Sequence, residues 1–149
     1  MIDCYKNQPW RISKRVLPQH TDHAGVMWHG AYLAWLEEAR VEALAQVGLS
    51  YSSLTLTGVE MPVVGIHVNY FKALRHGEEV DLDSWVLPNK GVRWPWTTRF
   101  IKGGNELVAE ASVDLVIVKS SLDSQKYQVI RRPPEYLDKA FQELQKGPE

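Results

Sequence analysis

One long helical stripe, followed by a run of strand-like segments, is the feature that most constrains the fold. Between about Gly30 and Val47, apolar side chains recur every three or four residues, at Tyr32, Trp35, Leu36, Ala39, Ala43 and Val47. This spacing predicts a helix with one apolar face, and Gly48 is suited to cap its C-terminal end. Such a helix must bury that face, and the remaining segments must supply the surface.

The remaining segments read mostly as strands. Four stretches at about 61–74, 79–87, 92–102 and 106–119 are separated by turns that contain glycine or proline. With a strand at about 10–17 and a short one at 126–131, they predict an antiparallel sheet, built as a meander of hairpins. The stretch 49–60 is rich in Ser, Thr and Gly, and we expect a loop there with at most one short turn.

Three details sharpen this prediction. Apolar residues from Leu107 onward alternate with Glu110, Ser112 and Asp114, which predicts one buried and one mixed face. Pro95 lies inside a predicted strand, so we expect an edge position or a bulge there, because proline cannot donate to a sheet ladder. The two prolines Pro133 and Pro134 are suited to open a C-terminal helix at about 134–146.

Composition narrows the class of protein. The 149 residues suit one domain spanning 1–149, and a net charge of −1 argues against a nucleic-acid partner. Cys4 is the only cysteine, which excludes an internal disulfide. No apolar run reaches the roughly 20 residues that span a bilayer, and the first residues lack the layout of a signal peptide. We therefore expect a cytoplasmic protein without a membrane span.

The chemistry of the chain is concentrated in the loop before the predicted helix. Three of the five histidines (His20, His23 and His29) lie within ten residues, together with Asp22 and Gly25. Because a helix begins there, the first backbone amides lack intrahelical acceptors and favour negative charge. A group that becomes anionic during a reaction would be stabilised at this point.

These residues resemble the signature of hotdog-fold acyl-CoA thioesterases. The similarity is to the 4-hydroxybenzoyl-CoA thioesterase-like branch, which includes the thioesterases associated with the Tol–Pal gene cluster. The residues that carry it are Thr21-Asp22, Gly25, Val26-Met27-Trp28-His29, Tyr32 and the Glu37 to Arg40 segment, with the stretch 71–79 fitting as well. The resemblance implies an α+β hotdog fold, in which one long central helix is wrapped by an antiparallel sheet of five or six strands.

The resemblance also implies an activity and a site. It implies hydrolysis of an acyl-CoA or acyl-carrier-protein thioester to the free acid and thiol, with Asp22 as the catalytic carboxylate and the His29 backbone N–H as oxyanion donor. Candidate substrate-binding residues are Gly25, Gly30, Tyr32, Lys72 and Arg75. The chemistry is reasonable in itself, because a thiol of pKa near 8.5 leaves readily as thiolate. We expect no cofactor and no metal.

Several alternatives stay open. Asp22 could act as nucleophile or as general base, or it could only cap the turn. The histidines and Asp22 could bind zinc or iron, and Glu37 or Glu38 could replace Asp22. The chain could also be a non-catalytic acyl-CoA-binding module, or a dehydratase that uses His23 with Asp22.

The expected sheet has two faces, and one helix can cover only one of them. The other face and the sheet edges need a partner, which we expect to be a second copy of the chain. A homodimer or a homotetramer would satisfy this need.

Overall fold

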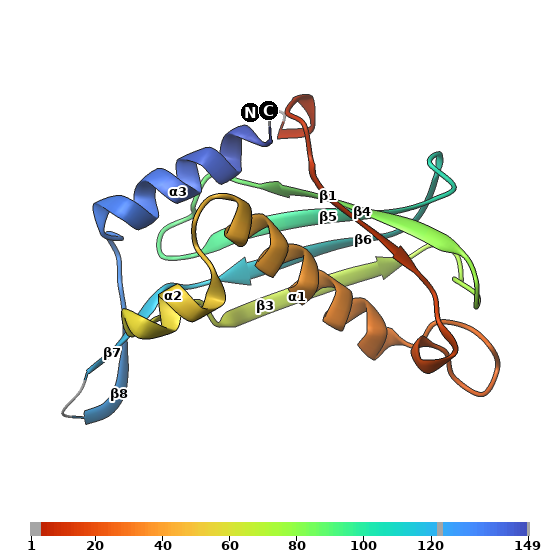
Figure 1. The fold of residues 1–149 in the computed structure, drawn as a ribbon, viewed down its shortest axis with the longest axis horizontal. Helices are drawn as coiled ribbons and strands as arrows, with labels where there is room; N and C mark the ends of the chain where they lie inside the picture. The colour runs from red at the N-terminus through yellow and green to blue at the C-terminus, as the bar shows by residue number, and fades with distance from the viewer. Residues whose placement is uncertain (1–3, 122–123, 149) are drawn as a thin grey trace.

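The computed structural model describes residues 4–121 and 124–148 (Figure 1). Short 3-10 helices lie at Cys4–Lys6 (η1) and Pro18–His20 (η2), and the α-helices are α1 (His29–Gln46), α2 (Tyr51–Leu56) and α3 (Glu135–Lys146). The strands are β1 (Trp10–Arg15), β2 (Val59–Glu60), β3 (Val63–Tyr70), β4 (Glu79–Val86), β5 (Trp94–Lys102), β6 (Glu106–Leu115), β7 (Val118–Ser121) and β8 (Ser124–Val129).

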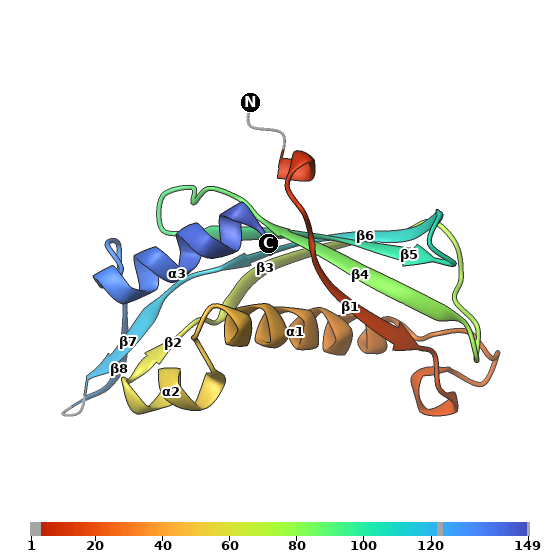
Figure 2. The ribbon, with the colours of Figure 1, turned by 45° about the horizontal axis from the view of Figure 1, so that its top comes forward.

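Five strands form one antiparallel sheet, in the order β1-β4-β5-β6-β3. Helix α1 lies across one face of this sheet, and the sheet curves over it (Figures 1 and 2). The α+β prediction of one long helix against an antiparallel sheet is confirmed. The predicted meander is wrong for β3, which pairs with β6 and not with β4. Because β1 occupies the free side of β4, the chain after β3 must cross the end of the sheet to reach β4.

The predicted helical stripe is the part of α1 that faces the sheet. Its buried residues are Ala31, Tyr32, Trp35, Leu36, Ala39, Ala43 and Leu44. Trp35 and Leu36 are almost completely buried, and each such side chain contributes roughly 1.5–3 kcal/mol relative to an exposed position. The apolar period predicted from sequence therefore fixes which side of α1 meets the sheet.

The C-terminal end of α1 closes as predicted from Gly48. The Gly48 N–H donates to the Ala45 carbonyl at 3.1 Å, and the Leu49 N–H donates to the Leu44 carbonyl at 2.9 Å. Gly48 has a φ of +85°, the left-handed conformation that this Schellman motif requires. Both leucines are buried, which adds the apolar contact typical of the motif.

The loop predicted for 49–60 is wrong in part, because this stretch contains helix α2 and strand β2. The Ser50 hydroxyl accepts a hydrogen bond from the Ser53 N–H at 3.2 Å and caps α2. Leu54 is buried and anchors the short helix to the core. A helix of six residues is too short to show a period, so composition alone favoured a loop.

Pro95 lies in β5, which is an interior strand between β4 and β6, so the predicted edge position or bulge is wrong. Its carbonyl accepts from the Leu87 N–H at 3.0 Å, one residue beyond the end of β4 at Val86. The side of Pro95 that lacks an N–H therefore faces the point where β4 ends. The Leu87 carbonyl, which receives no N–H from Pro95, accepts a hydrogen bond from the Gln145 side chain at 3.3 Å instead.

Leu107 is 37% exposed, so its predicted place on the buried face is wrong. The register of β5 and β6 shifts between Phe100 and Ile101, which leaves Val108 as an extra residue in β6. A bulge of this kind reverses which side chains point inward and which point outward in the part of the strand that precedes it. Val108 and Ala109 are both buried as a result.

The predicted strand at 106–119 is divided into β6 and β7. Strand β7 pairs with β2 and with β8, and these three form a separate small sheet. The predicted strand at 126–131 thus corresponds to β8 and lies outside the main sheet. Helix α3 packs Phe141 against Trp94, with ring centroids 4.4 Å apart.

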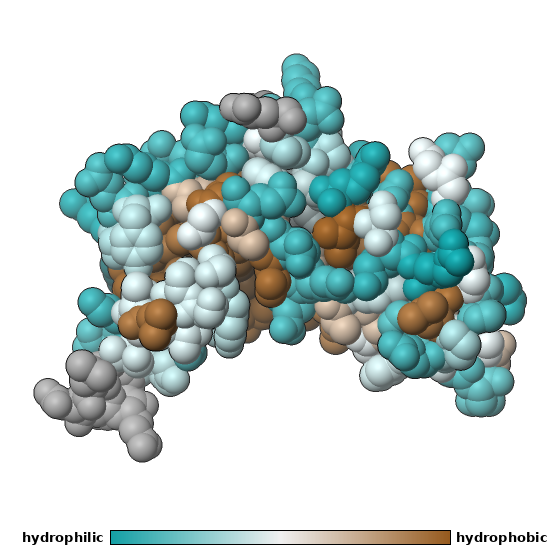
Figure 3. Space-filling view, viewed as in Figure 1, coloured by the Kyte–Doolittle hydropathy of each residue, from teal (hydrophilic) through white to brown (hydrophobic). Residues whose placement is uncertain are grey.

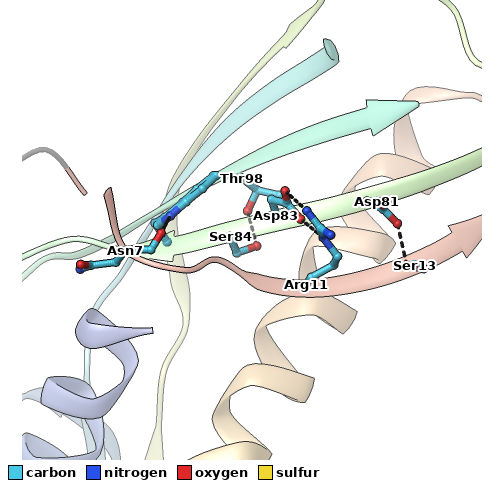
Figure 4. Close-up of polar contacts among 8 residues, drawn as sticks. Asn7, Arg11, Ser13, Asp81, Asp83, Ser84 and Thr98 are labelled. Carbon is cyan, nitrogen blue, oxygen red and sulfur yellow. Dashed lines mark hydrogen bonds and ion pairs between the residues drawn. The ribbon is translucent and has the colours of Figure 1, made fainter. Parts of the chain in front are cut away.

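The first strand is attached to the sheet by a polar ladder on the face away from α1 (Figure 4). Arg11 donates two hydrogen bonds to the Asp83 carboxylate, at 2.6 and 2.8 Å, and Ser13 donates to Asp81 at 2.6 Å. Asp83 is 4% exposed, and its hydrogen bonds and charge raise the pKa of Arg11. Paired in this way, Asp83 avoids the cost of an uncompensated buried charge.

Among the described helices, none is both long enough and apolar enough to cross a lipid bilayer.

Candidate active site

The loop before α1 is a tight turn that begins and ends with backbone hydrogen bonds. The Asp22 N–H donates to the Val26 carbonyl at 2.9 Å, and the Gly25 N–H donates to the Asp22 carbonyl at 3.0 Å. Gly25 has a φ of +79°, which side chains other than hydrogen rarely tolerate. The turn carries Asp22 at its start.

The Asp22 carboxylate is exposed, but its orientation is fixed by the turn. Its Oδ1 accepts hydrogen bonds from the Ala24 N–H at 2.9 Å and the Val26 N–H at 3.3 Å. Within residues 4–121 and 124–148, Oδ2 has no hydrogen-bond donor. The carboxylate therefore organises the turn through one oxygen, as the capping alternative requires, while the second oxygen is available to a ligand.

The start of α1 offers unused donors next to this turn. The helix begins at His29, and Trp28, its N-cap residue, makes no side-chain cap. In the described part of the chain, neither the His29 N–H nor the Gly30 N–H has an acceptor. The Trp28 N–H donates to the His20 carbonyl at 3.0 Å, which ties the helix start to the preceding segment.

Asp22 and His29 border the same open surface depression. Its lining residues are Thr21, Asp22, His23, Met27, Trp28 and His29. Asp22, with its free carboxylate oxygen, and His29, with its free amide, thus line one accessible surface. This juxtaposition could receive a carbonyl group together with a water molecule.

Trp28 covers the first turn of α1, a placement that we did not predict. A Cβ atom added to Gly30 would lie 2.1 Å from the Trp28 ring, so the indole rests directly on this glycine. Trp28 is nevertheless 46% exposed. Gly30, two residues after Trp28, is the sequence signal that could have indicated this contact, because a larger side chain there would displace the indole.

The other predicted substrate-binding residues lie in two settings. Tyr32 is buried and packs edge-on against Tyr70, with ring centroids 4.9 Å apart; burial, followed by the influence of Tyr70, raises the Tyr32 pKa to about 12. Lys72 is exposed and ion-paired with Glu106 at 3.0 Å. Arg75 is exposed, and its backbone forms an isolated β-bridge with Val26, in the turn that carries Asp22.

The histidine side chains have ordinary contacts. His20 accepts a hydrogen bond from the Leu17 N–H through Nδ1 at 3.0 Å and packs against Trp35, while His67 shares a 3.1 Å hydrogen bond with Asn69. Across 4–121 and 124–148, no three His, Cys, Asp or Glu side chains gather as a metal site would require.

The two rival acids on α1 point elsewhere. Glu38 is ion-paired with Lys14 at 2.9 Å. Glu37 lines a separate cavity beside Arg40, toward the C-terminal half of the helix. Neither acid borders the depression at the helix start.

Comparison with known proteins agrees with this architecture. The sequence profile of the thioesterase-like superfamily matches residues 16–141. Protein sll0410 of Synechocystis sp. is 35% identical over 127 residues, which cover 84% of this chain and 74% of that protein. The acyl-CoA thioester hydrolase YbgC of Escherichia coli O6:H1 is 30% identical over 109 residues, covering 73% of this chain and 81% of YbgC.

Among solved structures, the DHNA-CoA thioesterase from Staphylococcus aureus superposes with a TM-score of 0.77 at 26% identity. The match covers 89% of this chain and 87% of that enzyme. The long helix against a curved antiparallel sheet is the hotdog arrangement. By profile, sequence and fold, the chain belongs to the thioesterase-like superfamily.

Proposed function

We propose that this protein hydrolyses acyl-CoA thioesters at the depression where the Asp22 turn meets the start of α1. One observation carries the proposal: an Asp22 carboxylate with one oxygen fixed and one oxygen free borders the same surface as the unpaired His29 N–H. The relatives named as acyl-CoA thioester hydrolase and DHNA-CoA thioesterase support the reaction class.

In the proposed reaction, the thioester carbonyl oxygen accepts a hydrogen bond from the His29 N–H. Asp22 either attacks the carbonyl carbon through Oδ2 or removes a proton from a water that attacks it. The carbon–sulfur bond then breaks, and the thiolate leaves without prior protonation. On the nucleophilic route, water subsequently hydrolyses the acyl-Asp22 anhydride, so both routes give the carboxylic acid and the thiol.

The phosphates of coenzyme A would lie near Lys72 and Arg75. Both side chains are exposed, and the Arg75 backbone borders the Asp22 turn through Val26. Lys72 would have to exchange its ion pair with Glu106 for a phosphate. An exposed ion pair of this kind contributes only about 0.2–1 kcal/mol, so the exchange is feasible.

A second copy of the chain would complete the assembly. Strand β3 pairs with β6 on one side and forms the edge of the main sheet on the other. The exposed apolar residues along and just beyond it are Val63, Val64, Ile66, Tyr70 and Phe71. An apolar edge strand of eight residues is prone to pair with another strand, and a homodimer through β3 would cover it.

Thiol release tests the reaction directly. We expect the wild-type protein to release CoA from at least one of a panel of short-chain, long-chain and aromatic acyl-CoAs. Asp22→Asn keeps an acceptor for the Ala24 and Val26 amides but removes the basic, nucleophilic oxygen, so turnover should fall by about 10²–10⁴.

The matched control is Asp138→Asn, which changes an aspartate of α3 that accepts a hydrogen bond from Gln142. Its turnover should equal that of the wild type. Absence of thiol release from every acyl-CoA and acyl-carrier-protein thioester would refute the proposal. Near-normal turnover of Asp22→Asn would refute the role of this carboxylate.

A further inference from the structure

Glu78 lies just before β4, at the end of the molecule that carries the Asp22 turn. The surface at this end is mainly hydrophilic (Figure 3), and the next residue, Glu79, follows that pattern with a side chain that is 71% exposed. Glu78 differs, because its side chain is only 19% exposed. No step of the proposed hydrolysis uses this shielded acid.

Both oxygens of the Glu78 carboxylate have partners. Oε1 accepts a hydrogen bond from the Arg75 N–H at 2.6 Å, which closes the turn from Arg75 to Glu78. Oε2 is shielded from water and is ion-paired with Lys102 of β5. Hydrogen bonds to an ionised acceptor are stronger than those between neutral groups. The carboxylate therefore attaches this turn to an interior strand of the main sheet.

The backbone of the same turn is attached to the segment that follows β1. The Gly77 N–H donates to the Val16 carbonyl at 2.8 Å, and the Val16 N–H donates to the Glu78 carbonyl at 2.9 Å. Val16 is completely buried. The turn is thus held on one side by the core and on the other by the Glu78 side chain.

This turn lies directly beside the loop before α1 (Figure 2). Arg75 and Val26 form an isolated antiparallel bridge. The Met27 N–H also donates to the carbonyl of Leu74, the residue before the turn, at 2.7 Å. The position of Arg75 therefore determines where the backbone of Val26 lies.

Val26 in turn holds Asp22. The Val26 N–H donates to Asp22 Oδ1 at 3.3 Å, and the Val26 carbonyl accepts from the Asp22 N–H at 2.9 Å. One series of contacts thus runs from Glu78 through Arg75 and Val26 to Asp22. If the Glu78 carboxylate were removed, the Arg75 N–H would lose its acceptor, and the bridge that supports the Asp22 turn would loosen.

We propose that Glu78 is a positioning residue, whose carboxylate holds the Asp22 turn in its reactive place through Arg75 and Val26. The proposal rests on the proposed hydrolysis and deepens it, because it assigns a role to an acid that does not touch the substrate. A displacement of about 1 Å at a reacting group can lower a rate by about 10²-fold. A shielded contact remote from the reacting atoms can therefore control turnover.

Thiol-release kinetics test the proposal with an acyl-CoA that the wild type hydrolyses. In Glu78→Ala, kcat and kcat/KM should fall together by at least about tenfold. Glu78→Gln keeps an acceptor for the Arg75 N–H and should restore most of the turnover. The matched control is Glu79→Ala, which removes the neighbouring acid that pairs with Arg15 on the surface. Its kcat should equal that of the wild type.

A double-mutant cycle tests whether Glu78 acts through Asp22. When Glu78→Ala is added to Asp22→Asn, the residual turnover should fall by less than about twofold, because the carboxylate that Glu78 positions is already absent. A further tenfold loss in the double variant would contradict the proposal, since Glu78 would then act through another group.

Amide hydrogen exchange tests the same contacts without turnover. The Ala24 and Val26 N–H groups, which donate to Asp22 Oδ1, should exchange at least about tenfold faster in Glu78→Ala and at the wild-type rate in Glu79→Ala. Glu78→Asp keeps the charge but is too short to reach both partners, so it should accelerate the same amides if Glu78→Ala does not fold.

The proposal is overturned if the exchange rates of the Ala24 and Val26 amides, or kcat, are unchanged in the folded variant. Faster exchange of these amides in a protein whose wild type releases no thiol would refute the hydrolysis and support the contact between Glu78 and the Asp22 turn. The two failures are therefore distinguishable.

Discussion

The two ends of α1 differ in how they treat the backbone groups that a helix leaves unpaired. At the C-terminal end, Gly48 and Leu49 donate to the Ala45 and Leu44 carbonyls and close the helix. At the N-terminal end, the His29 N–H has no acceptor in the described residues, and a fixed carboxylate lies on the same surface. The closed end stabilises the fold, whereas the open end is available for chemistry.

This difference is informative because both ends depend on a glycine with positive φ. Gly25 has a φ of +79° and Gly48 a φ of +85°, and neither would place a Cβ within 4 Å of another group. An alanine at either position therefore meets backbone strain without a steric clash. The same substitution at the two ends isolates what each end does.

Gly25→Ala is expected to have the larger effect. The left-handed conformation should cost about 1–2 kcal/mol, and the relaxed turn would move the Asp22 carboxylate away from the helix start. Turnover should fall by at least about tenfold, since small displacements of reacting groups are expensive. Thiol-release kinetics and urea denaturation measure the two effects. Unchanged turnover in a destabilised Gly25→Ala variant would show that the turn does not position the site.

Gly48→Ala should produce a similar loss of stability and nothing more. We expect about 1–2 kcal/mol less free energy of unfolding, with turnover per folded molecule at the wild-type level. Gly48→Asn is the matched control, because asparagine tolerates this conformation better and should lose less stability. A decrease in turnover for Gly48→Ala would contradict the separation between the two ends.

Tyr32→Phe is expected to change how the stability depends on pH in the alkaline range, with no effect on the turn at either end of α1. Burial raises the Tyr32 pKa to about 12, above the value near 10 of an unfolded tyrosine. The unfolded chain therefore loses this proton first, so the stability from neutral Tyr32 is complete below pH 10 and declines toward pH 12. Denaturation of the wild type and of Tyr32→Phe at pH 8, 10 and 11.5 should show a shallower decline in the variant. If the free energy of unfolding declines equally in the wild type and in Tyr32→Phe, the raised pKa of Tyr32 is not the cause of the decline.

Local patterns in the sequence were enough for α1 and its ends. Apolar spacing identified the face of Trp35 and Leu36, and Gly48 marked the C-terminal end. The turn around Asp22 and Gly25 was visible as a polar loop before a helix. These features depend on residues close together in the chain.

Features that depend on distant segments were missed. The pairing of β3 with β6 follows from which strands occupy the edges, and the reversal at Leu107 follows from a bulge at Val108 that alternation cannot show. The cavity beside Arg40 requires α2 to fold over α1. Its sequence signal, a lone arginine on the flank of a helix, is identical to that of a solvated residue.

We propose that the His29 backbone N–H stabilises the developing oxyanion, and a backbone donor is tested by comparing two substitutions at one position. Proline is tolerated at the first helical residue, and Trp28 already has the extended conformation that precedes a proline. His29→Pro removes the N–H, whereas His29→Ala removes only the imidazole. Thiol-release turnover should fall by about 10²–10³ in His29→Pro and stay near the wild-type value in His29→Ala. Equal turnover in the two folded variants would show that the His29 N–H is not the oxyanion donor.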